Sequence, residues 1–170
     1  MSLTAPVVRR AEPSDFAEVA RLTVDAYRAD GQLDEDHGYG ELLADVATRA
    51  EHAELLVAAD GPAVLGAVAF VLPGTRYAEL SRPGEAEFRM LAVDPAAQRR
   101  GVAGALVRAC VVRATVLGCG SLVICSRERN AAAFALYERF GFVREPALDW
   151  MPVPGVNLLG LRLKLPTAVT

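Results

Sequence analysis

The segment of this 170-residue chain best suited to chemistry is a basic, glycine-containing turn between two apolar stretches. The first turn of a helix presents N–H groups without intrahelical partners, and the helix dipole makes that end positive. Small residues there let an anion approach the backbone. The residues concerned are Leu91, Ala92, Val93, Gln98, Arg99, Arg100, Gly101, Val102, Ala103 and Gly104. The pattern favours a phosphate-binding turn, although the same small residues also suit ordinary strand-to-helix packing.

Two common phosphate-binding motifs are missing from this turn. No Gly-Lys-Ser or Gly-Lys-Thr follows it, and no Gly-x-Gly-x-x-Gly opens the expected helix. A dinucleotide-binding domain would also alternate strands with helices, whereas strands are expected in succession over 55–59, 63–71 and 85–93. The sequence therefore excludes a P-loop nucleoside triphosphatase and disfavours a Rossmann-type domain.

Two blocks of sequence together resemble a known family. The first is Gln98-x-x-Gly101-x-Ala103, which follows Leu91-Ala92-Val93. The second block is Asn130-x-x-Ala133-x-x-Leu136-Tyr137-Glu138-Arg139-Phe140-Gly141-Phe142. In this order they resemble the acyl-CoA signature of the GNAT superfamily of N-acyltransferases. The resemblance covers residues 87–142, and the rest of the chain is similar in layout.

This resemblance implies a fold and an activity. The fold is α/β, a single GNAT-like domain over residues 1–170, with a central mixed, mostly antiparallel sheet of about seven strands flanked by four helices. The activity is N-acetyl transfer from acetyl-CoA to a primary amine of a small molecule or peptide, by direct attack in a ternary complex. The alternative is a non-catalytic acyl-CoA-binding regulatory module, which the presence of both Glu87 and Tyr137 disfavours.

The resemblance also assigns cofactor contacts outside the turn. It implies that the strand over 87–93 diverges from its parallel neighbour over 121–125, and that pantetheine pairs with the main chain around Leu91 and Val93. It places the Asn130 side chain, in the block with Ala133, near the pantetheine. Asn130 also suits the N-cap of its helix, which is the simpler role.

Acetylation of an amine requires a proton acceptor, because an alkylamine with a pKa of about 10.4 is almost wholly protonated at neutral pH. Glu87 is the candidate base, acting directly or through water. Strand alternation places Glu87, Arg89, Leu91 and Val93 on one face. Glu87 also suits a solvated role or an ion pair with Arg89, and two weaker alternatives for the base are Glu85 and Glu79.

The departing thiolate must gain a proton, and the resemblance assigns this role to the Tyr137 hydroxyl. Tyr137 also belongs to an apolar helical stripe with Ala133, Leu136 and Phe140, so its ring is equally suited to the core. A thiolate is a tolerable leaving group without help. Loss of the hydroxyl should therefore slow turnover without abolishing it.

By resemblance, the amine acceptor is bound by the segment over 30–40 and by the segment over 149–152. An acidic cluster would attract a cationic amine, and Trp150 can stack on an apolar acceptor. A solvated loop over 30–40 and a Trp150 that packs in the core are equally consistent with the sequence. The residues in question are Asp34, Glu35, Asp36, His37, Tyr39, Asp149, Trp150, Met151 and Pro152.

Composition narrows the functional class. The chain is 52% hydrophobic and 23% charged with a net charge of −3, which argues against nucleic-acid binding as its main role. Cys110, Cys119 and Cys125 form no metal-binding spacing and are interpreted as reduced, buried thiols. We expect a cytoplasmic protein with no metal and no membrane span, and by resemblance a possible homodimer.

Local patterns predict the order of the elements. Strands are expected over 6–10, 55–59, 64–71, 85–93, 121–125, 142–147 and 158–165. Helices are expected from Ser14 or Asp15 to near Gly31, over 41–51, over 101–117 and over 130–140. The segment over 73–84 is expected to be a loop.

Overall fold

The computed structural model describes residues 4–34 and 38–166 of the chain. The chain divides into two compact units, one made of Met1–Phe70 with Met90–Cys110 and the other of Val71–Arg89 with Val111–Thr170. Among the described residues, seven strands form a mixed sheet in the order β1-β2-β3-β4-β5-β7-β6. The expected α/β fold with a mixed, mostly antiparallel seven-stranded sheet is confirmed, and the single-domain organisation stays a prediction.

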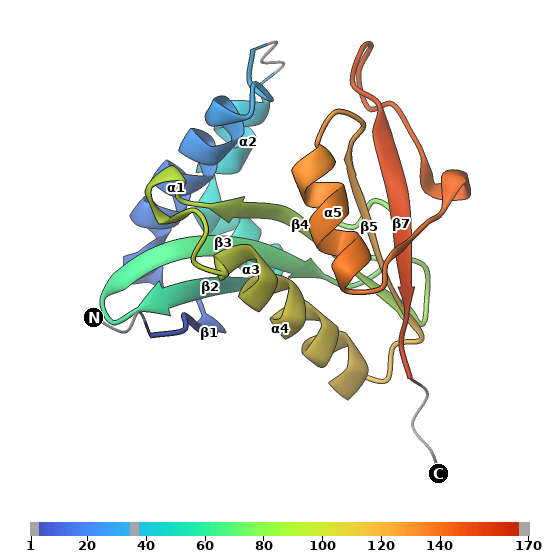
Figure 1. Cartoon of the computed structure of the whole chain (residues 1–170), viewed down its shortest axis with the longest axis horizontal. Helices are drawn as coiled ribbons and strands as arrows, with labels where there is room; N and C mark the ends of the chain where they lie inside the picture. Colours follow the sequence, from blue (N-terminus) through green and yellow to red (C-terminus); the bar gives the residue numbers. More distant parts are fainter. Residues whose placement is uncertain (1–3, 35–37, 167–170) are drawn as a thin grey trace. The chain divides into compact units, whose positions relative to one another are not determined.

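The first unit is built around antiparallel strands. β2 pairs with both β1 and β3, and Gly61 turns the β2–β3 hairpin with a φ of +56°, as the Asp60-Gly61 pair predicts (Figure 1). Its elements are β1 (Val7–Arg10), η1 (Pro13–Asp15), α1 (Phe16–Ala29), α2 (Tyr39–Ala44), α3 (Val46–His52), β2 (Glu54–Asp60), nearly all of β3 (Ala63–Val71), the second half of β4 (Glu85–Val93), η2 (Pro95–Ala97) and the start of α4 (Val102–Val116).

The second unit contains the start of β4, the end of α4 and the C-terminal elements. β5 pairs parallel with β4 and antiparallel with β7, beside which it runs in Figure 1. β7 also pairs antiparallel with β6. The remaining elements are β5 (Ser121–Arg127), α5 (Ala131–Arg139), β6 (Val143–Arg144), η3 (Pro146–Leu148) and β7 (Leu158–Lys164).

The core of the first unit lies between its helices and strands. Val19 and Leu22 of α1 are wholly buried, as the helical spacing of apolar residues in this segment predicts. The buried cluster consists of Val19, Leu22, Val46, Leu55, Val57, Val64, Ala67 and Ala92. Ala92 places one end of the candidate cofactor strand in this core, so burial fixes that strand's position.

The helix expected over 41–51 is wrong, because two short helices, α2 and α3, occupy this stretch. Asp45 separates them with a ψ of +70°, and its side chain accepts a hydrogen bond from the Thr48 N–H at 3.4 Å. An aspartate that caps a new helix competes with continuation of the previous one. The described residues consequently hold five α-helices instead of the expected four.

One strand boundary differs from the expectation. The strand expected over 142–147 is limited to Val143–Arg144, because Pro146 opens the turn η3 and has no N–H for a sheet. The helix expected from Ser14 or Asp15 begins at Phe16, directly after η1, and its N-cap Asp15 makes no side-chain capping hydrogen bond. The Asp15 carboxylate instead accepts hydrogen bonds from the Glu12 N–H at 2.8 Å and from the Arg9 guanidinium.

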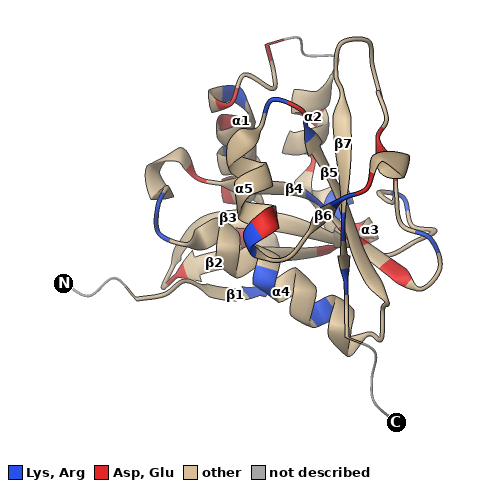
Figure 2. Cartoon of the chain, turned by 45° about the vertical axis from the view of Figure 1, so that its right-hand side comes forward, with Lys and Arg blue, Asp and Glu red and all other residues tan. Residues whose placement is uncertain are grey.

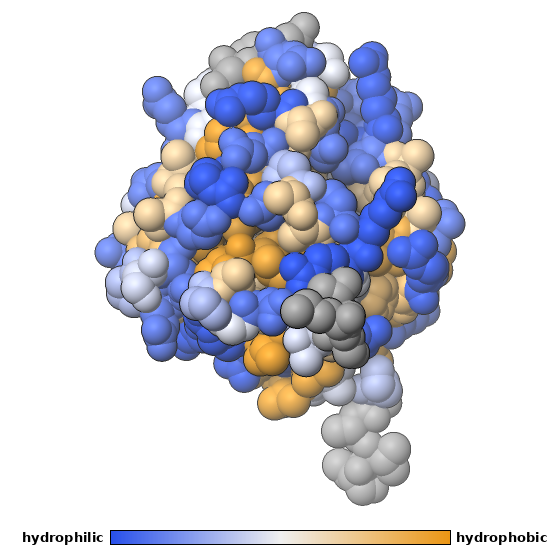
Figure 3. Space-filling model, turned by 60° about the vertical axis from the view of Figure 1, so that its left-hand side comes forward, coloured by the Kyte–Doolittle hydropathy of each residue, from blue (hydrophilic) through white to orange (hydrophobic). Residues whose placement is uncertain are grey.

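Charged and apolar residues are mixed on the surfaces that can be seen. Figure 2 shows basic and acidic residues interspersed along helices, strands and loops. On the face in Figure 3, hydrophobic residues appear in separate clusters among hydrophilic ones. No helix within residues 4–34 and 38–166 combines the length and apolarity needed to cross a bilayer.

Candidate functional site

The turn before α4 has the backbone shape of an anion site. Arg99 and Gly101, two residues apart, adopt left-handed φ values of +64° and +74°. Backbones that alternate in this way point successive N–H groups into one concavity, which binds anions. A Cβ built at Gly101 or at Gly104 would meet no heavy atom within 4 Å. The space beside these two glycines is open, as approach of a diphosphate requires.

The turn is fastened at its start by contacts of Asp94 within the first unit. The Asp94 N–H donates to the Leu65 carbonyl at 2.8 Å, and the Asp94 carboxylate accepts from the Ala96 N–H at 3.0 Å. Arg21 of α1 forms an ion pair with Asp94 at 2.6 Å. Burial opposes ionisation of Asp94, but the Ala96 N–H and the Arg21 guanidinium hold its pKa below the ordinary value. The role of Arg21 was missed, because nothing local in the sequence links residues this far apart.

Arg100 contributes a structural contact to the turn. Its Nη2 lies 2.8 Å from the Asp60 carboxylate at the end of β2. This pair ties the turn to the β2–β3 hairpin. Arg99, in contrast, is exposed and retains its charge for an approaching anion.

Gly66 of β3 allows the first turn of α4 to approach the sheet. A Cβ at Gly66 would lie 2.7 Å from Val102 Cγ1 and 2.8 Å from the Ala92 carbonyl oxygen. Both distances are shorter than real Cβ contacts, so glycine is required here for space. The requirement for glycine at position 66 is not visible in the sequence, because it arises from tertiary packing.

The candidate pantetheine strand, Leu91 to Val93, follows an irregular residue. Met90 has a φ of +55°, which ordinary strands do not contain. Met90 and Arg99 are the two non-glycine residues with left-handed φ among the described residues, and they bracket the candidate cofactor strand. Burial along the strand still alternates through Met90. Phe88, Met90 and Ala92 are buried, and Arg89, Leu91 and Val93 are partly exposed.

In the second unit, the parallel ladder between β4 and β5 is short. It runs from Glu85↔Ser121 to Glu87↔Val123 and does not include Phe88 and Ile124. Glu87 therefore lies at the position where the two parallel strands stop pairing. This agrees with the divergence expected from the sequence resemblance.

The Glu87 carboxylate is buried in a set of hydrogen bonds. The residue is 1% exposed. Its oxygens accept from the backbone N–H groups of Glu79 at 3.1 and 3.2 Å, Leu80 at 3.3 Å and Ser81 at 3.0 Å. The Ser81 hydroxyl donates a further bond at 2.6 Å. Glu87 thus fastens the loop before β4, and its role as the base stays a prediction.

Glu79 and Arg89 complete this cluster. Their side chains form an ion pair and are 20% and 19% exposed, and the Arg89 guanidinium also donates to the Tyr77 carbonyl at 3.0 Å. Burial, the largest influence, raises the pKa of Glu79 above its ordinary value, against the opposing charge of Arg89. The nearby charge of Glu87 adds to the increase. Glu85, the other alternative base, is paired instead with Arg162.

Tyr137 and Asn130 occupy defined positions at α5. The Tyr137 ring is buried and lies 5.9 Å from the Phe88 ring and 5.8 Å from the Phe142 ring, between centroids. The core reading of the ring is therefore correct, and the role of its hydroxyl stays a prediction. The Asn130 side chain accepts from the Ala133 N–H at 3.2 Å, so Asn130 is the N-cap of α5.

All three thiols are poor nucleophiles at neutral pH. Burial raises the pKa of Cys110 and Cys119, and it raises the pKa of Cys125 to about 11. A hydrogen bond between Trp150 and Cys125 opposes the shift at Cys125. A thiol rather than a thiolate predominates under these conditions.

The expected acceptor segments are described in part. Glu35, Asp36 and His37 lie outside the described residues. The Tyr39 ring lies 5.8 Å from the Tyr27 ring, between centroids. Trp150 forms a backbone bridge to Leu158.

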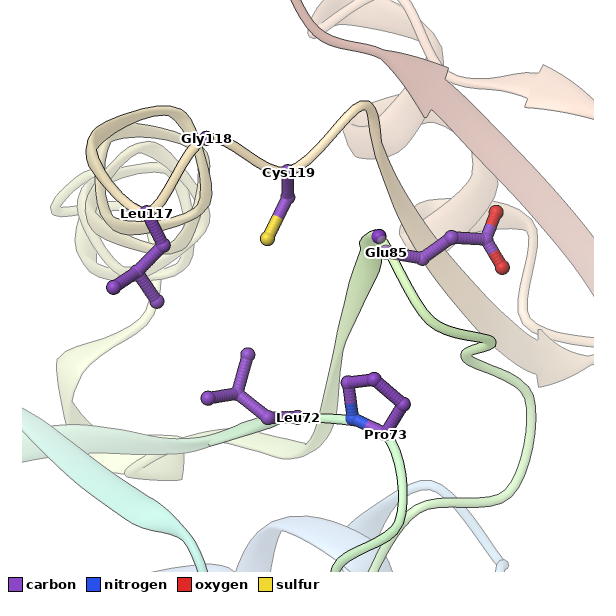
Figure 4. A pocket seen from close by; sticks show the side chains of 7 residues that line it. Leu72, Pro73, Glu85, Leu117, Gly118 and Cys119 are labelled. Carbon is purple, nitrogen blue, oxygen red and sulfur yellow. The ribbon is translucent and has the colours of Figure 1, made fainter.

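A hollow lies within the second unit. Figure 4 shows the side chains of Leu72, Leu117 and Cys119 turned into it, whereas the Glu85 carboxylate points away. Its lining consists of Leu72, Pro73, Gly84, Glu85, Leu117, Gly118 and Cys119. Neither the candidate cofactor-binding residues nor the candidate catalytic residues Tyr137 and Glu87 line this hollow. In the described part of the chain, no group of His, Cys, Asp and Glu has the arrangement of a metal site.

Known proteins share both the sequence pattern and the fold. The model of the acetyltransferase (GNAT) family matches residues 16–142. N-alpha-acetyltransferase 30 of Xenopus laevis is 36% identical over 76 residues, which cover 45% of this chain and 28% of the relative. The chain thus matches little more than a quarter of that relative's length.

Two solved structures are similar over nearly their whole length. The ribosomal-protein-S18-alanine N-acetyltransferase from Escherichia coli has a TM-score of 0.68 at 19% identity, with 96% of each chain covered. The PaiA N-acetyltransferase from Thermoplasma acidophilum, in complex with coenzyme A, has a TM-score of 0.71 at 13% identity, with 95% of this chain and 99% of that chain covered. At these identities the two likenesses show the fold, and the family match carries the assignment. The chain belongs to the acetyltransferase (GNAT) family.

Proposed function

We propose that this protein transfers an acetyl group from acetyl-CoA to a primary amine of a small molecule or peptide, by direct attack. The observation that carries the proposal is the open, left-handed turn at Arg99 and Gly101 before α4, in a chain of the GNAT family. Successive N–H groups there suit the diphosphate of the cofactor. Leu91, Ala92 and Val93 would hold the pantetheine, and Gln98, Arg99, Val102, Ala103 and Gly104 the region of the phosphates.

Acetyl-CoA supplies an activated acetyl thioester. The amine nitrogen forms a bond to the acetyl carbon while the carbon–sulfur bond breaks. An ammonium ion becomes an amide in this reaction, so it loses two protons. One proton is taken by the carboxylate of Glu87 or Glu79 and passes to water. Tyr137 donates a proton to the sulfur. The nitrogen releases its second proton to water, and Tyr137 regains a proton from water.

Direct attack is favoured over an acetyl-cysteine intermediate. A thiol must ionise before it attacks a thioester, and the pKa of Cys125, raised to about 11, opposes this. The buried Cys110 and the partly exposed Cys119 are shifted in the same direction. Kinetics should therefore show both substrates bound before the first product leaves.

The acceptor class is best searched among peptide N-termini first. The relative from Xenopus laevis is named as an N-alpha-acetyltransferase, and the Escherichia coli protein is named for an alanine of ribosomal protein S18. An α-amino group has a pKa of about 7.7–8.0, so it needs less help from a base than an alkylamine. Polyamines, aminoglycosides and free amino acids form the comparison panel.

The experiment is a thiol-release assay with acetyl-CoA and this panel, combined with thermal unfolding. Release of coenzyme A that depends on a particular amine supports the proposal. A rise in melting temperature with acetyl-CoA, without thiol release for any amine, would support the non-catalytic regulatory module instead.

A further inference from the structure

We propose that Glu79 is the group that takes the proton from the acceptor amine, and that Glu87 and Arg89 are positioning residues that hold it. This inference rests on the proposed acetyl transfer to an amine. Glu87 on β4 then supports the loop before the strand, and Glu79 on that loop meets the substrate.

The acceptor sites of the Glu87 carboxylate are already used by hydrogen bonds. A carboxylate has about four lone-pair sites. Three successive backbone N–H groups, from Glu79 to Ser81, and the Ser81 hydroxyl all donate to Glu87. Since the residue is 1% exposed, an amine could reach it only by displacing these donors. This arrangement suits an anchor for the loop.

Glu79 has the opposite combination of contacts. Its side chain is 20% exposed and its carboxylate is paired with one side-chain cation, Arg89. Water or an amine can therefore reach it from the exposed side. Burial raises the pKa of Glu79, and the charges that face it are Arg89, which opposes the increase, and Glu87, which adds to it. A base works best when its pKa approaches the working pH.

The cluster lies where β4 and β5 part. The Glu87 anchor is the last β4 residue paired with β5, at Val123, and Arg89 follows two residues later. Glu79 contacts Glu87 through its N–H and Arg89 through its carboxylate, so the three residues form one cluster in the second unit. The cluster lies beside main chain of β4 that has no partner in β5.

The proton step is simple to balance. The Glu79 carboxylate takes one proton from the ammonium group, and the nitrogen lone pair is thereby freed to attack the acetyl carbon. Glu79 is then a neutral carboxylic acid, and it returns to its starting state by releasing the proton to water. No oxidant, metal or further reactant is required.

The decisive experiment compares kcat/KM across pH for the wild type, Glu79→Gln and Glu87→Gln, with Glu51→Gln as the matched control on a residue whose side chain is 75% exposed. Glu79→Gln should lower kcat/KM about 100-fold near neutral pH. The deficit should shrink as the pH approaches the pKa of the amine, because the free amine then needs no base. The rise in melting temperature with acetyl-CoA should be unchanged.

Positioning residues should give a different pattern. Glu87→Gln should lower kcat/KM by the same factor at every pH. It should also lower the melting temperature, because the three N–H groups of residues 79–81 and the Ser81 hydroxyl lose their carboxylate partner. Ser81→Ala removes one donor without touching a carboxylate, and it should give a smaller loss, also constant with pH. Glu51→Gln should match the wild type.

The reverse pattern would overturn the inference. If Glu79→Gln parallels the wild type across pH, and the deficit of Glu87→Gln disappears at high pH, then Glu87 is the base. A wild type that binds acetyl-CoA but acetylates no amine would refute the proposed function, and this inference with it. A wild type that acetylates an amine, beside a Glu79→Gln variant whose deficit does not change with pH, would overturn this inference alone.

Discussion

Glu87 and Phe88 are neighbours on β4, and their side chains contact different structures on opposite faces of the strand. The Glu87 carboxylate accepts hydrogen bonds from residues 79–81, whereas the Phe88 ring lies 5.9 Å from the Tyr137 ring, between centroids. Alternation along a strand produces this separation. The candidate proton acceptors, Glu79 and Glu87, thus lie toward one face of β4, and the candidate proton donor, Tyr137, lies toward the other. Such an arrangement suits an amine and a departing thiolate on opposite sides of the acetyl group.

A substitution at the turn tests the phosphate site. Gly101→Glu should abolish the increase in melting temperature caused by acetyl-CoA, because it adds a bulky negative group where the diphosphate would bind. For the wild type, ligand at about 100 times its Kd adds about 2.7 kcal/mol of stability, or about 5–10 °C. Gly155→Glu is the matched control, since Gly155 also has a left-handed φ and open space around it. An unchanged shift in Gly101→Glu would show that the phosphate site is elsewhere.

Removal of one hydroxyl tests the proton donor. Tyr137→Phe keeps the ring contacts with Phe88 and Phe142, so the melting temperature and the acetyl-CoA shift should change little. The kcat should fall by about 10- to 100-fold because the thiolate then leaves without a proton donor. Steady-state kinetics at saturating substrates measure the effect. Turnover equal to that of the wild type would remove Tyr137 from the mechanism.

The close approach at Gly66 predicts a clear stability effect. Gly66→Ala places a Cβ within 3 Å of Val102 and of the Ala92 carbonyl, so it should destabilise the protein by about 1–3 kcal/mol. Gly104→Ala is the matched comparison inside α4, where a Cβ meets nothing within 4 Å. It should be neutral or stabilise by up to about 1 kcal/mol. Urea unfolding without ligand measures both, and equal stabilities of the two variants would contradict the packing described here.

The Arg9–Asp15 pair predicts a loss of stability in acid. The hydrogen bond from Arg9 holds the pKa of Asp15 below its ordinary value, so the ionised form is favoured by folding. This contribution is complete above the unfolded pKa of about 3.9 and disappears as the pH falls through the lower, folded pKa. Asp15→Asn should cost about 1–3 kcal/mol at neutral pH and progressively less below pH 4 or so. Asp25→Asn, at a more exposed ion pair, is the control and should change little.

The sequence predicted most of the fold because its signals were local. Several signals are recognisable within a few residues: alternating apolar residues, the Asp60-Gly61 turn, and Gly118 just after α4. The break at Asp45 was missed because a capping aspartate inside a helical pattern resembles an ordinary surface residue. Pro146 opens the turn η3 two residues after β6 ends, and a proline at that point is visible in the sequence as a break in the strand.

The candidate site was predictable in part. The turn over 98–104 and the Asn130 cap follow from residue types and spacing. The left-handed Met90 and the room required at Gly66 could not be anticipated, because both depend on packing against distant residues. The loop over 73–84 was expected, but its contacts were not. Nothing local indicated that Glu79 would lie beside Arg89 or that Ser81 would donate to Glu87.

The most direct test of the proposed acetyl transfer is to mix the protein with acetyl-CoA and the panel of peptides and small amines, and to measure coenzyme A and acetylated amine together. We predict that the two products form in equal amounts with at least one amine, well above the rate without protein. If acetyl-CoA stabilises the protein but coenzyme A appears no faster than without it for any amine, the proposed acetyl transfer is wrong.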